Sequence, residues 1–138
     1  MIGRMFILGC TTILASCAVF QPPAPEDWVT QRAEAQAQAL IARDYDVARS
    51  YTTPAYQQSE RSKYYAANFS GSSFWQRAEV AWVRCGGEPN PTRCEVRLWV
   101  YGQFPRAGAY ASQRGDDVPA SLDSVWIKID NNWYQYLD

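Results

Sequence analysis

The chain has 138 residues, which is enough for one domain with its own hydrophobic core. Its 13 basic and 14 acidic side chains give a formal net charge of −1, so no basic excess exists to drive binding to nucleic acid or to anionic lipid. Histidine is absent, which excludes Ser-His-Asp and Cys-His catalytic arrangements and metal sites that depend on imidazole.

The first residues have the layout of a secretory signal. Arg4 precedes an apolar run over residues 5–15, which is shorter than the about 20 residues that a helix needs to cross a bilayer. Two small residues, Ala15 and Ser16, close the run. A positive start, a short apolar core and a small-residue exit predict a signal peptide over residues 1–16.

The four residues Leu14-Ala15-Ser16-Cys17 resemble the lipobox of bacterial lipoproteins. The resemblance implies cleavage before Cys17 and attachment of fatty acids to its thiol. Ala18 follows the cysteine, and in Gram-negative bacteria this pattern implies an outer-membrane lipoprotein that faces the periplasm. Cys10 is a poorer match because the bulky Leu8 precedes it by two positions. An ordinary secretory signal with an incidental cysteine is the alternative.

A proline-rich linker is expected over residues 17–25, with Pro22, Pro23 and Pro25 forming a semi-rigid spacer. The domain itself is expected over residues 26–138. Removal of the signal peptide takes away Arg4 and no acid, which leaves 12 basic and 14 acidic side chains. The partner that this front end predicts is therefore the membrane, reached through the lipid.

Two cysteines, Cys85 and Cys94, remain in the predicted domain. They bracket a turn-rich octapeptide between two strand-like runs. In an oxidising compartment this arrangement predicts a disulfide. The alternative, a metal site, would need further thiol or imidazole ligands, and the mature chain has none. No metal and no cofactor is therefore expected.

Helical periodicity begins at Glu26, with Val29, Ala33, Ala37, Leu40 and Ile41 on one face. The helix is expected to end at residues 44–45. A second helix is predicted over residues 47–52, capped by Asp46 and stopped before Pro54. A third is expected from Ser59 or Ser62 to about residue 68.

From residue 75 the apolar period changes to two, which predicts strands over residues 75–85, 94–104, 122–130 and 133–137. Residues 130–132 suit a tight hairpin turn, since Asp and Asn tolerate positive φ. Residues 105–121 read as a long polar loop. Helices followed by an antiparallel sheet predict an α+β fold. The expected core-facing strand residues are Val96, Leu98, Val100, Val125, Ile127 and Ile129.

Three runs, "ALIARDYDVARSYTTPAY", "SSFWQRAEVAWVRC" and "DSVWIKIDNNWYQY", resemble the nuclear transport factor 2-like superfamily. The resemblance implies a cystatin-like cone, in which a curved antiparallel sheet wraps around one long and two shorter helices. Members of the superfamily include isomerases, cyclases, dehydratases, secretion-system subunits and binding-only domains. The resemblance therefore predicts architecture and leaves the activity open.

Carboxylates are the remaining candidates for a general base, and each has a structural explanation. Asp44 and Asp46 suit helix capping, the Asp116-Asp117 pair suits solvation, and Glu79 and Glu95 lie beside Arg77 and Arg97 on predicted strands. No catalytic residue is predicted, and the domain is expected to bind rather than catalyse. A carboxylate base with a tyrosine donor, as in the isomerases, is the open alternative.

Aromatic residues on the strands predict a docking surface. The set is expected to lie on the outer sheet face, away from the core, and consists of Arg97, Trp99, Tyr101, Trp126 and Lys128. Trp, Tyr and Arg are enriched in interface hot spots, so a protein partner, another component of the cell envelope or a second copy of the chain could bind there. The alternative is that these rings only stabilise neighbouring strands.

An inner pocket is the competing prediction. Its expected lining at the wide end of the cone is Tyr51, Tyr56, Tyr64, Tyr65 and Trp82. Apolar walls with hydroxyl donors would suit a small-molecule enzyme or carrier of the isomerase type. In the alternative interpretation the same side chains fill the cone as core.

Overall fold

The computed structural model describes residues 22–103 and 118–138. The predicted signal peptide, Cys17 and the Asp116-Asp117 pair lie outside these residues. Within them the elements follow in the order α1 (Pro25–Ile41), α2 (Tyr45–Ser50), α3 (Pro54–Gln58), 3₁₀-helix η1 (Glu60–Tyr64), α4 (Tyr65–Asn68), 3₁₀-helix η2 (Ser70–Phe74), β1 (Trp75–Gly86), β2 (Arg93–Gly102), β3 (Val118–Ile129) and β4 (Asn132–Tyr136).

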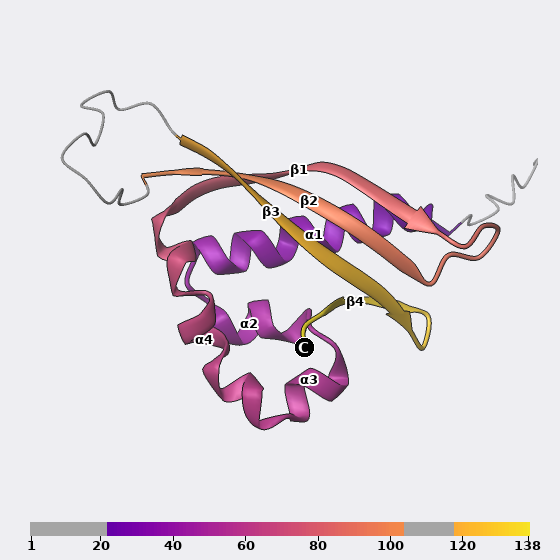
Figure 1. The fold of residues 1–138 in the computed structure, drawn as a ribbon, viewed down its shortest axis with the longest axis horizontal. Helices are drawn as coiled ribbons and strands as arrows, with labels where there is room; N and C mark the ends of the chain where they lie inside the picture. The colour runs from indigo at the N-terminus through magenta and orange to yellow at the C-terminus, as the bar shows by residue number, and fades with distance from the viewer. Residues whose placement is uncertain (1–21, 104–117) are drawn as a thin grey trace, which may run out of the picture.

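The strands form one antiparallel sheet in the order β1-β2-β3-β4. The long helix α1 lies along one face of the curved sheet, and the shorter helices α2, α3 and α4 continue the layer beyond it (Figure 1). We call the sheet face toward α1 the inner face and the opposite one the outer face. The predicted α+β architecture, with helices packed on a curved antiparallel sheet, is confirmed.

The long helix starts and ends by recognisable local chemistry. Pro25 occupies its first turn, where a missing N–H costs nothing, and Glu26 and Asp27 lie near the positive end of the helix dipole. At the other end Arg43 adopts φ 60°. The Arg43 N–H then donates to the Leu40 carbonyl (3.1 Å) and the Asp44 N–H to the Ala39 carbonyl (2.8 Å). This is a Schellman motif with arginine in the position that glycine favours.

The first two short helices have other capping residues than the sequence predicted. Asp44, rather than Asp46, caps α2 through a hydrogen bond from the Val47 N–H (3.2 Å). Thr53 caps α3, and Pro54 opens that helix instead of stopping the preceding one. The predicted third helix is divided between η1 and α4. Capping by Asp44 confirms the structural explanation of that carboxylate.

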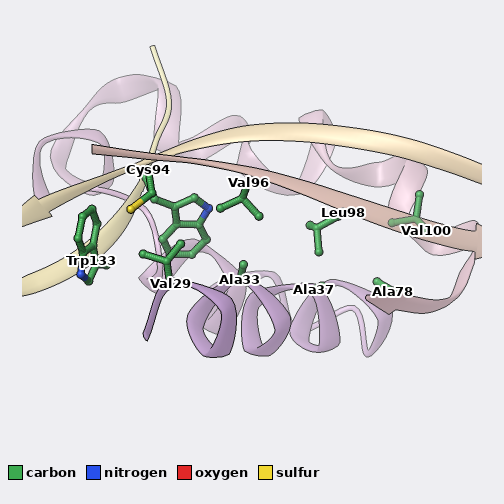
Figure 2. Packing of buried hydrophobic residues seen from close by; sticks show 10 residues of the cluster. Val29, Ala33, Ala37, Ala78, Cys94, Val96, Leu98, Val100 and Trp133 are labelled. Atoms are coloured by element: carbon green, nitrogen blue, oxygen red, sulfur yellow. The ribbon is translucent and has the colours of Figure 1, made fainter. Parts of the chain in front are cut away.

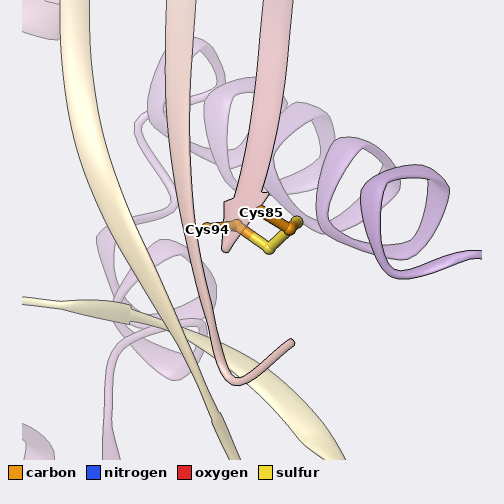
Figure 3. Close-up of a disulfide and its surroundings, with 2 residues drawn as sticks. All are labelled: Cys85 and Cys94. Atoms are coloured by element: carbon orange, nitrogen blue, oxygen red, sulfur yellow. A yellow bond between two sulfur atoms is a disulfide. The ribbon is translucent and has the colours of Figure 1, made fainter. Parts of the chain in front are cut away.

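Two hairpin turns lie within the described residues. At the loop end of the first, between β1 and β2, Cys85 faces Cys94 in the register and forms the predicted disulfide (Figure 3). The second hairpin turns at Asp130 (φ 47°) and Asn131 (φ 60°). Both residues tolerate the left-handed region, so the predicted turn chemistry is confirmed.

The main core fills the space between α1 and the inner face. Val29, Ala33 and Ala37 of α1 lie against strand residues along the sheet (Figure 2). The strand residues of this core include Val96, Leu98 and Val100, as expected, and also Cys94, Trp126 and Trp133. The small alanines let the helix approach the sheet closely, while the two indoles fill the wider space near the start of α1.

The predicted inward orientation of β3 is wrong by one residue. Trp126 pairs with Cys94, and directly paired residues point to the same face of a sheet. Because Cys94 lies on the inner face, Trp126 does too, and it is fully buried there. Val125 and Ile127 instead pair with the exposed Glu95 and Arg93, and Ile129 shares their face. A shift of one residue inverts every side chain of a strand, so one misplaced tryptophan changes the whole assignment.

Candidate functional site

The outer face presents side chains that the β1–β2 register places opposite one another. Glu79 faces Trp99, and Arg77 faces Tyr101. Trp99 is 39% exposed, which is a large fraction for an indole in the middle of a sheet. We call the group Arg77, Glu79, Arg97, Trp99 and Tyr101 the Trp99 patch. Among residues 22–103 and 118–138, no helix lies over this face of the sheet (Figure 1).

The side chains of the Trp99 patch hold one another in place. The Tyr101 hydroxyl donates to a Glu79 carboxylate oxygen (2.7 Å), and Arg77 donates to the other oxygen (3.0 Å). The Arg77 guanidinium also lies 3.7 Å from the centroid of the Tyr101 ring. The hydrogen bond to Glu79 raises the pKa of Tyr101 above its usual value. Glu79 is thus engaged in cross-strand pairing, as its structural explanation predicted.

A second pairing extends the patch to β3. Arg97 donates two hydrogen bonds to Asp123, each of 2.7 Å, in a bidentate arrangement. These hydrogen bonds raise the pKa of Arg97 and lower the pKa of Asp123. Both groups are exposed to solvent, so the pair fixes geometry more than it adds stability.

Trp82 lies on the outer face and not in a pocket, which corrects its predicted place. The β1–β2 register shifts between Val80 and Trp82, so Trp82 faces Arg97. Its ring lies under two guanidinium groups, with Arg84 at 4.3 Å and Arg97 at 5.1 Å from the ring centroid. The irregularity at Ala81 therefore turns an apparent interior residue outward.

Three of the five residues predicted for docking share the outer face: Arg97, Trp99 and Tyr101. Trp126 does not, because it is buried in the core. Lys128 does not either, because it pairs with the buried Trp133 and alternates with Trp126 on the inner side of β3. Of the residues predicted for docking, only those on β2 therefore remain candidates.

The structure places the predicted pocket residues in different surroundings. Tyr56 and Tyr65 are buried in a second core cluster and meet edge to face, with ring centroids 6.4 Å apart. Tyr51 is half-buried, with the Arg32 guanidinium 4.9 Å from its ring centroid, and Tyr64 is 64% exposed. The alternative interpretation, in which Tyr56 and Tyr65 fill the cone as core, agrees with the structure.

A buried polar cluster between the two cores was missed by the sequence analysis. The Gln36 amide donates to the Gln135 side-chain oxygen (2.6 Å), to the Tyr65 hydroxyl (3.3 Å) and to the Ala48 carbonyl (3.3 Å). Burial raises the pKa of Tyr65, so its hydroxyl stays protonated. Position 36 lies on the same face of the helix as Ala33, Ala37 and Leu40, and this spacing could have predicted that Gln36 is buried.

The interior offers amides and hydroxyls rather than a base. The buried polar residues of the described chain are Gln36, Thr52, Thr53, Ser62, Ser72 and Gln135, with no Asp or Glu among them. The described residues also contain no group of three or more His, Cys, Asp or Glu side chains that could hold a metal ion.

Two hollows on the surface were also not predicted. The first, of about 370 Å³, opens at the wide end of the cone and is lined by Asn68, Phe69, Gly71, Ser72, Phe74, Trp75 and Leu122. We call it the mouth hollow. The second, of about 490 Å³, lies beside the β1–β2 hairpin and is lined by Arg84, Cys85, Gly86, Arg93 and Glu95. We call it the hairpin hollow.

Known proteins resemble this chain in structure and not in sequence. No protein-family model and no curated protein sequence matches it. A SEC-C motif containing protein from Psychrobacter arcticus superposes with a TM-score of 0.58 at 15% identity, over 86% of this chain and 63% of that one. An NTF-2 like protein of unknown function from Shewanella oneidensis MR-1 superposes with a TM-score of 0.52 at 14% identity, over 79% and 92% of the two chains.

These likenesses show the fold alone. The described part of the chain has the nuclear transport factor 2-like architecture, as the sequence resemblance implied. The chain spans 63% of the length of the Psychrobacter protein, so that protein is substantially longer. In the residues that were placed, no helix is both long and apolar enough to traverse a bilayer.

Proposed function

We propose that the chain is a lipoprotein of the bacterial outer membrane, anchored through Cys17 and facing the periplasm, whose domain binds a protein rather than catalysing a reaction. The observation that supports docking best is the Trp99 patch. It combines an exposed indole with arginine and tyrosine side chains, the residue types that are enriched in interface hot spots.

Hydrogen bonds already hold the charged side chains and Tyr101 of the Trp99 patch in the unbound domain. Tyr101 is fixed by Glu79 and stacked by Arg77, and Arg97 is fixed by Asp123. Side chains that are already immobile lose little conformational entropy on binding, which would favour affinity. The positive and negative groups of the patch alternate, so a protein surface of mixed charge suits it better than a polyanion.

The interior supports a binding role over an enzymatic one. The buried residues of the described chain include no carboxylate, and histidine is absent from the whole sequence. A reaction that needs a general base at neutral pH would therefore need one outside this interior.

The test is crosslinking of the acylated protein in its native envelope, with Trp99→Ala compared with Tyr64→Ala. Both variants remove one exposed aromatic ring, but Tyr64 lies on η1, away from the sheet. Trp99→Ala should reduce recovery of the crosslinked species by at least about tenfold, the effect of a hot-spot residue. A crosslink to the chain itself identifies the partner as a second copy.

Equal recovery with both variants would contradict docking through the Trp99 patch. Mass spectrometry of the same material tests the anchor separately. A mature N-terminus at Cys17 with added acyl mass is expected, and a free N-terminus without it would contradict the lipoprotein assignment.

The second candidate is a carrier of small apolar molecules, and the mouth hollow favours it. Phe69, Phe74, Trp75 and Leu122 give the hollow apolar walls, and Asn68 adds a polar group at its edge. A saturable fluorescence change on addition of an apolar dye, lost in Phe74→Ala and kept in Trp99→Ala, would favour this candidate over docking.

A further inference from the structure

The hairpin hollow brings two arginines together. Arg84 faces Glu95 and Gly86 faces Arg93 in the register, so Arg84 and Arg93 are diagonal neighbours on the outer face. Diagonal neighbours on one face lie within about 8 Å, within reach of long side chains. Both arginines line the same hollow of about 490 Å³.

The charge of the hairpin hollow is not balanced. Arg93 and Glu95 form a long ion pair of 3.9 Å. Arg84 lies over the Trp82 ring, and within the described residues it forms no ion pair. The lining of the hollow therefore holds two guanidinium groups and one carboxylate, and only Arg93 is paired with it. The contact with the Trp82 ring engages Arg84 without using a hydrogen bond, and among the described residues its N–H donors have no acceptor, so they could bind a phosphate group.

A glycine lines the hollow beside the two arginines. A Cβ atom at Gly86 would meet no other atom within 4 Å. The backbone beside the two arginines is therefore bare and open, so a larger side chain could enter the hollow without disturbing its surroundings. This property gives the site a direct test.

The hairpin hollow lies at the end of the domain from which the chain leads to Cys17. Val29, in the first half of α1, packs with Cys94 and Trp133, so the helix starts at the hairpin end (Figures 1 and 2). Four residues lie between Cys17 and Pro22, so the two are five positions apart. Even fully extended, this stretch spans at most about 18 Å. An acyl anchor at Cys17 would thus hold the hollow close to the lipid headgroups.

We propose that the hairpin hollow binds the phosphate of a lipid headgroup through Arg84 and Arg93, so that the domain stands on its hairpin end. This inference rests on the proposed lipid anchor, which concentrates headgroup phosphate near the site. The mouth hollow lies beyond the far end of α1, a helix of 17 residues and about 26 Å. It would then lie on the side of the domain away from the bilayer.

The first experiment measures binding of inorganic phosphate to the acylated full chain in an uncharged detergent. Amide resonances of Gly86 and Arg93 should shift in a saturable way. Arg84→Gln should weaken this binding by at least about tenfold, since it removes a charged group that can donate two hydrogen bonds to one phosphate. Gly86→Val should also weaken it, because an apolar side chain would then stand beside the two arginines. Arg61→Gln, which removes an exposed arginine from η1, is the matched control.

The second experiment places the acylated chain in lipid nanodiscs that contain a paramagnetic headgroup. The Gly86 amide should broaden more than the amide of Gly71, which lies at the mouth. Arg84→Gln should reduce the difference and Arg61→Gln should keep it. If phosphate binds but Gly71 broadens as much as Gly86, the ligand is free phosphate and the membrane-facing orientation is wrong.

If Arg84→Gln behaves like Arg61→Gln in both experiments, the site itself is wrong. If the proposed lipid anchor is wrong, the two experiments give a different pattern of results. A chain without acyl mass would not enter the nanodiscs, while the phosphate titration in detergent would still report on the hollow.

Discussion

Arg43 occupies a backbone conformation that suits another residue better. Its φ of 60° lies in the left-handed region, where a Cβ atom crowds the following carbonyl group. The Schellman hydrogen bonds at the end of α1 require this conformation, whichever side chain is present. The side chain of Arg43 is exposed, so little packing offsets the cost.

We expect Arg43→Gly to raise the free energy of unfolding by about 0.5–1 kcal/mol, because glycine adopts positive φ without steric cost. The measurement is urea denaturation followed by tryptophan fluorescence. Ala42→Gly is the control: Ala42 has φ −73°, so glycine there should destabilise the domain. A loss of stability in Arg43→Gly would contradict the assignment of strain to this residue.

Single residues also mark the limit of the sequence analysis. Alternation along residues 122–130 gave two choices of face, and the aliphatic set Val125, Ile127 and Ile129 was the more apolar. The structure buries Trp126 instead, with its indole N–H donating to the Ser124 hydroxyl (3.1 Å). The space between α1 and the sheet decides the face, and this space is not visible in the strand's own pattern.

At the scale of elements, the hairpin turns were predictable, but the side-chain orientation was predicted for β2 and not for β3 or for Trp82 on β1. Gly, Pro, Asn and Asp at the turns located both hairpins, and the cysteine pair fixed the ends of the first. The irregularity between Val80 and Trp82 was not predictable, because nothing in a run of alternating residues marks one that is skipped. Trp82 was assigned to the interior for this reason.

The disulfide should stabilise the first hairpin chiefly by restricting the unfolded chain. It closes a loop with a sequence separation of 9 residues. Replacing both cysteines with serine should lower the free energy of unfolding by about 2–3 kcal/mol. Without the disulfide, the unfolded chain regains the conformational entropy that closing a loop of this size removes. Urea denaturation of the double variant measures it, with Ser121→Ala, at an exposed serine on β3, as the control. An unchanged midpoint would show that the hairpin is already closed in the unfolded state.

At the scale of the molecule, the two ends and the two faces of the domain have different properties. The inner face is filled by core, the outer face presents the Trp99 patch, and the hollows lie at opposite ends of α1. The general architecture followed from the order of helices and strands. The hollows did not, because each is made by residues distant in sequence, such as Phe69 and Leu122 at the mouth.

The buried phenol of Tyr65 links the stability of the whole domain to alkaline pH. Its pKa is raised in the folded state, first by desolvation on burial, whereas an unfolded tyrosine titrates near 10. Folding is therefore favoured fully below pH about 10, and the advantage is lost as pH rises above that value. The slope that Tyr65 adds is about 1.4 kcal/mol per pH unit.

Tyr65→Phe should remove this slope, because phenylalanine carries no titrating group. We expect it to cost about 1 kcal/mol at pH 8, through loss of the acceptor for Gln36. The difference from the natural protein should then shrink or reverse between pH 10 and 11. Urea denaturation at each pH measures both effects, with Tyr64→Phe, at an exposed position, as the control. A constant difference from pH 8 to pH 11 would mean that Tyr65 reaches solvent in the native state, and the cluster of Gln36, Tyr65 and Gln135 would then be open to water.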